Sequence, residues 1–151
     1  MSEEAIFAKK TVPVEFVYNT KFRLKNESDF NDWIKEIAIS EGFSVGNLNY
    51  AFFDDEGLKA LNNKFLNHDY YTDVISFNES KGFVINGDIA ISVERVKENS
   101  TKYNTFFEKE MLRVMAHGLL HLMGFDDKTD TERIAMQNAE NIKIKMFHVE
   151  Q

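Results

Sequence analysis

The feature that most constrains this sequence is the segment 106–123, which is apolar around most of its circumference when drawn as a helix. Threonine and glutamate pairs spaced like capping boxes bound it: Thr105 with Glu108 before it, and Thr129 with Glu132 after it. A helix without a broad polar face is buried inside a domain, so the rest of the chain must supply the layers that cover it. The pattern therefore predicts a long buried helix followed by a second one.

The segments that precede this helix alternate between strand and helix patterns. Four of them have the apolar and β-branched residues of strands: residues 13–25, 48–52, 73–77 and 83–93, the last two joined by NESKG as in a hairpin. Two helices are expected between the strands, one with Ser28 as its N-cap and one opened by Asp54 and Asp55. This order predicts an α+β fold, a small mixed β-sheet packed with helices in a single domain, residues 1–151.

Composition limits the role that a bound group could have. With 151 residues, 43% of them apolar, and 14 Phe, the chain can bury a core large enough to fold without a structural metal. It contains no Cys, so a metal ion must be held by His, Asp or Glu and is expected to serve function. No apolar run approaches the ~18 residues that span a bilayer. MSEEAIFAKKT, at residues 1–11, is acidic where a signal peptide is basic, so we expect a cytoplasmic protein with no membrane partner.

The segment HGLLHLMGFDD carries the candidate metal-binding residues. His117 and His121 lie one turn apart on the predicted helix, with Cβ atoms roughly 6 Å apart, so both imidazoles can reach one ion. Gly124 then ends the helix, and the short loop that follows keeps Asp126 and Asp127 close to the histidines. Three protein ligands with a fourth position for water are typical of catalytic zinc.

The spacing alone leaves other interpretations open. Two of the four histidines can fall at this spacing by chance, and buried histidines can bind backbone carbonyls. Paired aspartates after a helix are common turn residues. Gly118 costs ~1 kcal/mol relative to Ala inside a helix, which indicates that another group approaches the backbone closely there. It also occupies the place of the general-base Glu of HExxH metalloproteases, which disfavours peptidase chemistry.

HGLLHLMGFDD resembles the signature of the YbeY family of rRNA-processing endoribonucleases, in which HGxLHLxGYD is followed by a third histidine. LNNKF, TDVISF and GDIAIS, at residues 61–65, 72–77 and 87–92, are similar to further family segments in the same order. The resemblance implies a zincin-like metal-bearing helix and a metal-dependent single-strand endoribonuclease of rRNA maturation and ribosome quality control. It also implies one Zn²⁺ at His117, His121 and Asp127, and RNA, as rRNA on ribosomal particles, as the partner.

Two departures from the family pattern bear on the site. Asp127 stands where the family has its third histidine; a carboxylate is a competent zinc ligand, but it lowers the Lewis acidity of the ion and also suits iron or manganese. Asp126 is the rival ligand, since either carboxylate could turn inward. Leu66 stands where the family typically has an arginine thought to contact phosphate. Lys64 and His68 are nearby candidates for that contact, or solvated surface residues.

Contacts with RNA must be local, because the net charge of -7 repels a polyanion. Lys21, Arg23 and Lys25 would share one face of a strand, either as a basic stripe that binds RNA or as a charged edge that prevents aggregation. Tyr70 and Tyr71 could stack on bases or pack at a strand entrance.

The expected mechanism uses water activated by the metal ion to attack a phosphodiester, because no side-chain general base is evident. Two alternatives remain. One is a noncatalytic ribosome-associated factor that binds metal, and the other is a zincin-like hydrolase of another class. The sequence leaves the oligomeric state open.

Overall fold

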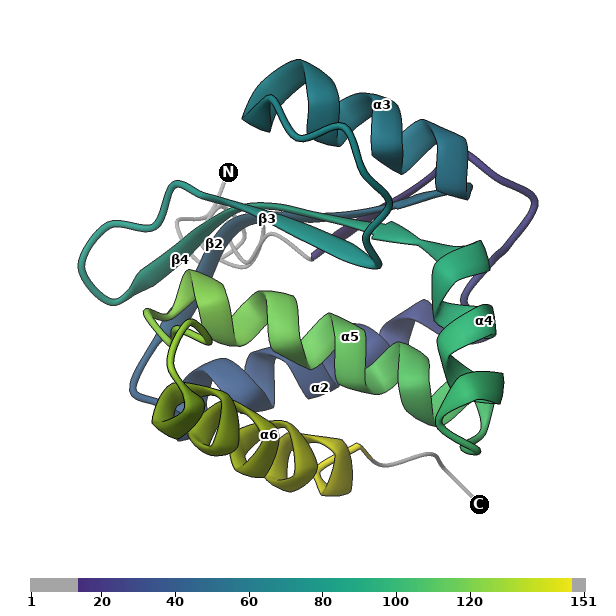
Figure 1. The fold of residues 1–151 in the computed structure, drawn as a ribbon. Helices are drawn as coiled ribbons and strands as arrows, with labels where there is room; N and C mark the ends of the chain where they lie inside the picture. Colours follow the sequence, from purple (N-terminus) through teal and green to yellow (C-terminus); the bar gives the residue numbers. More distant parts are fainter. Residues whose placement is uncertain (1–13, 148–151) are drawn as a thin grey trace, which may run out of the picture.

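A computed structural model describes residues 14–147, with helices on both faces of a 4-stranded sheet (Figure 1). The strands are β1 (Glu15–Tyr18), β2 (Ser44–Phe53), β3 (Val74–Asn78) and β4 (Val84–Ser92). The helices are α2 (Glu27–Ser40), α3 (Asp55–Leu66), α4 (Val93–Lys102), α5 (Phe107–Leu122) and α6 (Asp130–Lys145). The predicted α+β class is confirmed.

The sheet is mixed and has the strand order β1-β2-β4-β3. β1, β2 and β4 run parallel to one another, whereas β3 runs antiparallel to β4 and pairs Ile75 with Ala90. Parallel neighbours need a crossover connection, which α2 supplies between β1 and β2. β3 and β4 are joined by residues 79–83, which include most of NESKG, so the predicted hairpin is confirmed.

α5 lies between the sheet and α6, which explains why its sequence is apolar around most of its circumference (Figure 1). It packs on β3 and β4 on one side and on α6 on another, and it also contacts α4. α2 packs on β2 on the same side of the sheet, while α3 covers the opposite face. The buried helix expected over residues 106–123 is confirmed.

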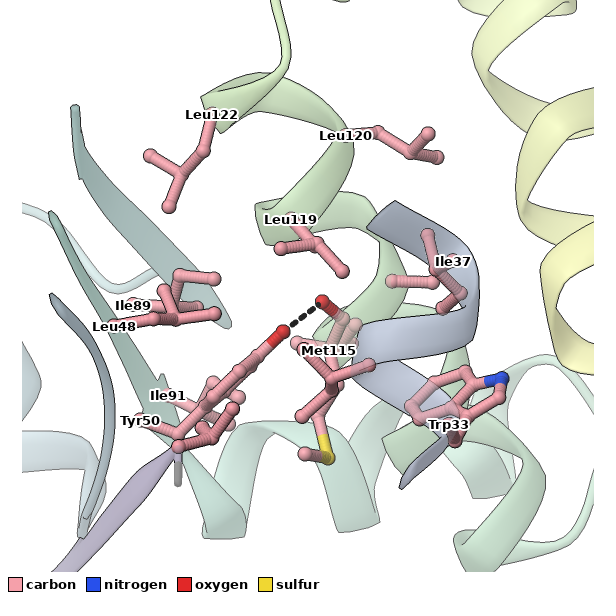
Figure 2. Packing of buried hydrophobic residues seen from close by; sticks show 14 of the residues in the cluster. Trp33, Ile37, Leu48, Tyr50, Ile89, Ile91, Met115, Leu119, Leu120 and Leu122 are labelled. Carbon is pink, nitrogen blue, oxygen red and sulfur yellow. Dashed lines mark hydrogen bonds between the residues drawn. The ribbon is translucent and has the colours of Figure 1, made fainter. Parts of the chain in front are cut away.

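The core forms where side chains of the sheet meet α5 and α2 (Figure 2). Its largest buried members include Trp33, Ile37, Leu48, Tyr50, Ile89, Ile91, Met115 and Leu119. The hydroxyl of Tyr50 donates a hydrogen bond of 3.0 Å to the carbonyl of Met115, so this buried polar atom is satisfied. Each such side chain contributes ~1.5–3 kcal/mol by burial. His117 and His121 are half-buried and lie outside this hydrophobic cluster.

Two predicted helix starts are confirmed. The Thr129 hydroxyl accepts from the Glu132 amide, and the Glu132 side chain accepts from the Thr129 amide, which completes the capping box of α6. Asp54 caps α3 by accepting from the Gly57 amide. These caps fix where α6 begins, and so where its side chains meet α5.

Two other predicted starts are wrong. α2 is capped by Asn26, whose side chain accepts a backbone hydrogen bond from the first turn, and Ser28 already lies within that turn. α5 begins after Phe106 without a side-chain cap. The Thr105 amide instead donates to the Ser100 carbonyl and closes the turn that ends α4, so Thr105 belongs to the end of one helix and not to the start of the next.

Two predicted strands run too long. β1 ends at Tyr18 instead of continuing to residue 25, and the Asn19 amide makes the last backbone contact, with the Phe52 carbonyl. β4 ends at Ser92, because the Ser92 hydroxyl accepts from the Arg95 amide and caps α4. The sequence pattern does not predict α4, because Val93 extends the apolar run of β4.

Residues 1–13, which include Pro13 and the acidic segment that is expected not to be a signal peptide, lie outside the described residues. Across residues 14–147, no helix combines the length and the apolar character that a membrane crossing requires. The cytoplasmic location stays a prediction.

Candidate metal centre

His117 and His121 lie one turn apart on α5 and bring their imidazoles together, as predicted. The two rings meet edge to face with centroids 4.6 Å apart, and their Nε2 atoms are 3.0 Å apart. The side chains are 23% and 27% exposed, because they open into a groove. Both side chains are therefore half-buried, although α5 itself lies inside the domain.

The turn after α5 carries Asp127 back toward the helix. Gly124 has a φ of 99°, a backbone conformation that residues with a side chain rarely adopt. The Phe125 amide then donates to the Leu120 carbonyl, so the chain reverses direction directly after the helix. This reversal is the local reason why a residue ten positions after His117 lies beside it.

Asp127 completes a group of three possible metal ligands. Its Oδ2 lies 3.3 Å from Nε2 of His117 and 3.3 Å from Nε2 of His121. Within the described part of the chain, this is the group of His, Asp or Glu residues close enough to share one ion, and the rival carboxylate, Asp126, is not in it. Ligand atoms separated by 3.0 to 3.3 Å suit an ion ~2.0–2.1 Å from each, since bonds of that length give tetrahedral edges of roughly 3.3 Å.

Hydrogen bonds on the far side of each imidazole set the direction of the ligand lone pairs. Nδ1 of His117 lies 2.6 Å from Oε2 of Glu140, and Nδ1 of His121 lies 2.9 Å from the Phe125 carbonyl oxygen. Both partners are acceptors, so each Nδ1 carries the proton and each Nε2 presents a lone pair. Two lone pairs and a carboxylate oxygen thus face one another, an arrangement that a cation stabilises, either a metal ion or a proton on one ring.

Glu140, on α6, is a residue of this candidate site that the sequence predictions missed. It is buried, and its second oxygen accepts from Nη1 of Arg113 at 2.9 Å, which links α6 to α5 at the metal centre. The sequence carries no clear signal for it: Met136, Glu140 and Lys143 share one helical face, but two of the three are charged, and only the structure shows that all three are buried. A buried glutamate needs polar partners, and His117 and Arg113 supply them.

The surroundings of the centre are acidic. Burial lowers the pKa of His117, but the hydrogen bond and the charge of Glu140, with the charges of Asp127 and Asp73, outweigh it and raise that pKa overall. Burial also raises the pKa of the Asp73 and Glu110 carboxyls. A cation bound between the histidines and Asp127 would relieve this concentration of negative charge.

The three candidate ligands line a groove of about 770 Å³, within the size range of ligand sites. α3 and the loop that follows it contribute Asn62, Leu66, His68 and Tyr70 to the same groove. β3 contributes Ser76, and α6 contributes Arg133 and Glu140. The groove therefore brings the segments LNNKF and TDVISF to the histidine-bearing helix.

Most of the chain matches one family model, described as Endoribonuclease YbeY, over residues 16–148. This chain belongs to the YbeY family. A relative named Endoribonuclease YbeY from Flavobacterium johnsoniae is 48% identical over 138 residues, 91% of this chain and 99% of the relative. One of the same name from Flavobacterium psychrophilum is 44% identical with the same coverage. The solution structure of TM1509 from Thermotoga maritima is similar with a TM-score of 0.63 and 26% identity, covering 89% of this chain and 88% of that one.

The position of the usual YbeY arginine is occupied by Leu66, which lines the groove. His68 lines it as well. Lys64 is not among the lining residues, and its ammonium lies 5.1 Å from the centre of the Phe65 ring. Of the two nearby basic candidates, the structure brings His68 and not Lys64 to the groove.

The predicted basic stripe is not on a strand. Lys21, Arg23 and Lys25 are exposed and Leu24 is buried, so the expected alternation is present, but these residues follow the end of β1. Nη1 of Arg23 donates to the carbonyls of Thr20 and Phe22, both at 2.7 Å. None of the three basic residues lines the metal groove, and an RNA contact by them stays a prediction.

Gly118 allows α5 to approach the sheet. A Cβ at this position would lie 2.7 Å from Cγ2 of Ile89, and the Ser76 hydroxyl donates to the Gly118 carbonyl at 3.2 Å. The close approach expected from the glycine is therefore confirmed, and the approaching groups are β3 and β4. The contact fixes the height of the histidines above the sheet.

Proposed function

We propose that this chain is a metal-dependent endoribonuclease that holds one divalent ion at His117, His121 and Asp127 and cleaves RNA in the adjoining groove. One observation carries the proposal: the three ligand atoms lie 3.0 to 3.3 Å apart, while both imidazole protons are engaged elsewhere. Membership of the YbeY family supports RNA as the substrate, because the relatives are named endoribonucleases.

Zinc is the ion that we propose, because two imidazoles and a carboxylate with an open fourth position are a common catalytic zinc set. The same set also suits iron and manganese, which makes them the competitors to test. When bound, such an ion makes water a better nucleophile near neutral pH and stabilises negative charge on a phosphodiester.

The chain's own residues prepare the site. Glu140 and the Phe125 carbonyl hold the imidazoles of His117 and His121 in the tautomer whose Nε2 atoms can bind a cation. Asp127 contributes a full negative charge where the family has a neutral imidazole, which lowers the effective charge of the centre. The groove beside these residues gives an RNA strand access to them.

The same proposal extends to the biological role. The segment HGLLHLMGFDD and the family membership support rRNA on ribosomal particles as the substrate, and rRNA maturation and ribosome quality control in the cytoplasm as the process. We also propose that residues 1–151 form a single hydrolase domain.

The test compares metal content with cleavage of a labelled single-stranded RNA. Wild-type protein should hold about one equivalent of metal and cleave the RNA. His117→Ala and Asp127→Ala should lose both properties and keep a cooperative thermal transition, since the core does not include these residues. Asp126→Ala is the matched control and should keep both.

Two outcomes would contradict the proposal. A wild-type protein that binds metal but leaves RNA intact would be a noncatalytic metal-binding factor. An Asp127→Ala variant that keeps a full equivalent of metal while Asp126→Ala loses it would move the third ligand by one residue.

A further inference from the structure

The loop that follows α3 presents an aromatic pair to the metal groove. The rings of His68 and Tyr70 stack with centroids 5.1 Å apart and planes 20° apart, and the Tyr70 hydroxyl lies 2.9 Å from Nδ1 of His68. Both residues line the groove that also contains His117 and His121. Tyr70 is 53% exposed, so much of its ring is open to a ligand.

The backbone of this loop is held in place independently of the two rings. Asn62, which is buried in α3, donates its side-chain amide to the Tyr70 carbonyl at 3.2 Å. The His68 amide donates to the Asn62 carbonyl at 3.2 Å, and Asn67 ends α3 in the left-handed conformation, with a φ of 57°. The loop therefore does not need the rings of His68 and Tyr70 for its conformation.

The neighbouring Tyr71 shows how a structurally engaged tyrosine differs. The Lys59 ammonium lies 4.5 Å from the centre of its ring and the Arg95 guanidinium 5.3 Å from it, and its hydroxyl donates to Glu56. Tyr71 is not among the residues that line the groove. Of the two tyrosines considered for base stacking, Tyr70 faces the groove and Tyr71 has structural partners.

The charges of the side chains that line the groove are unfavourable for binding RNA through its phosphates. Its acidic side chains outnumber its arginines, and both arginines have acidic partners: Arg113 pairs with Glu140, and Arg133 pairs with Asp130. Leu66 adds an apolar side chain where the family has a cation. Apart from a bound metal ion, the groove must then hold a polyanion by contacts other than charge, and stacking on an aromatic ring is the contact that every base can make.

We propose that His68 and Tyr70 form a stacking site for an unpaired nucleobase of the RNA, in the same groove as the metal centre. This inference rests on the proposed function and deepens it by naming how the substrate is held. The site fits the single-stranded RNA that the family resemblance already implies, because the bases of a duplex are already stacked on one another. It should also tolerate any base identity, since each base has a π-face.

The test replaces the aromatic ring of Tyr70 with an aliphatic side chain. In a His117→Ala background, where the RNA stays intact, Tyr70→Leu should weaken binding of a fluorescein-labelled single-stranded RNA about 5- to 150-fold. Tyr70→Phe should bind like Tyr70, because it keeps the ring, and the matched control Tyr71→Leu should leave the Kd unchanged. In the otherwise wild-type enzyme, Tyr70→Leu should raise KM for cleavage far more than it lowers kcat, a readout that stands if His117→Ala itself weakens binding.

The dependence of binding on salt identifies the group that Tyr70 contacts. Loss of a base contact leaves the salt slope unchanged, whereas loss of a phosphate contact flattens it by roughly 0.7 for a single strand. An unchanged Kd and KM in Tyr70→Leu, or a flattened slope, would overturn the stacking site while leaving the nuclease proposal intact. Wild-type protein that neither binds nor cleaves RNA would overturn both, and that result is distinguishable from the first.

Discussion

Replacement of Glu140 by Gln removes one of two acceptors at the metal centre. The carboxylate accepts from Nδ1 of His117 at 2.6 Å through one oxygen and from Nη1 of Arg113 at 2.9 Å through the other. Glutamine has a single acceptor oxygen, so its NH₂ group must face one of these donors. If the NH₂ group faces His117, the imidazole loses the acceptor that keeps its proton on Nδ1. Nε2 is then no longer held in the form that presents a lone pair to the metal.

The expected loss follows from these contacts. Removing the partner of a metal-ligating histidine typically weakens metal binding ~10- to 100-fold, or about 1.4–2.7 kcal/mol. The metal-free protein should also lose roughly 1–3 kcal/mol of unfolding free energy, because a buried donor is left without its acceptor. Arg113 is 29% exposed, so water can replace its partner, and we expect the lower half of that range.

Zinc affinity, measured by competition with a chelator, is the assay for Glu140→Gln. Asn141→Ala is the matched control, because Asn141 accepts from Nη2 of Arg113 at 2.8 Å but does not touch His117. The control should bind zinc as tightly as the wild type. Equal zinc affinities for Glu140→Gln and wild type would refute the reasoning that Glu140 positions His117.

Three further predictions concern the ligands, the basic residues and pH. Asp127→Asn should weaken metal binding because a neutral amide is a poorer ligand, whereas Asp127→His should retain zinc and move the pH–rate profile toward lower pH. Metal content and pH–rate profiles of both variants check this, and a zinc-free Asp127→His would show that the loop cannot adjust. Changing Lys21, Arg23 and Lys25 together should weaken RNA binding and flatten its salt dependence if they contact phosphates, whereas an unchanged slope would leave them as a charged surface. Because the pKa of His117 is raised, its proton competes with metal at a higher pH than for an ordinary histidine, so zinc affinity should fall as pH drops through that raised value. In the metal-free protein the raised pKa contributes stability that is complete below the unfolded value of about 6.5 and is lost as pH rises through the folded value. Thermal melts of metal-free wild type and His117→Gln across this range measure that contribution, and parallel curves would contradict it.

Local patterns were sufficient where the cause of a structure is local. The histidine pair, the turn at Gly124 and the cap at Thr129 depend on residues a few positions apart, and each was predicted from its neighbours. The position of α5 inside the domain can also be predicted from the sequence, because a helix that is apolar on most sides has to lie between other layers. The choice of Asp127 over Asp126 needed the family motif, since both carboxylates lie in the same short loop.

Predictions failed where distant residues decide the outcome. Glu140 meets His117 only because α6 packs on α5, and nothing near Glu140 in the sequence indicates which side chain it will contact. The strand predicted to residue 25 stops at Tyr18, where pairing with β2 ends, although the alternation of exposed and buried residues continues beyond it. Thr105 fits a capping pattern, but its amide is used by the turn that ends α4.

α6 also connects the metal centre to α2. Five residues before its end it carries Glu140, and three residues later Lys143 donates to Glu41 at 2.7 Å while its carbonyl accepts from the indole of Trp33 at 2.7 Å. Metal binding and the docking of α6 are therefore thermodynamically linked, and linkage is reciprocal. An ion at the centre should slow amide exchange along α6, and any partner that pulls α6 from α2 should speed release of the ion. Retention of the metal becomes a measure of whether the last helix is in place.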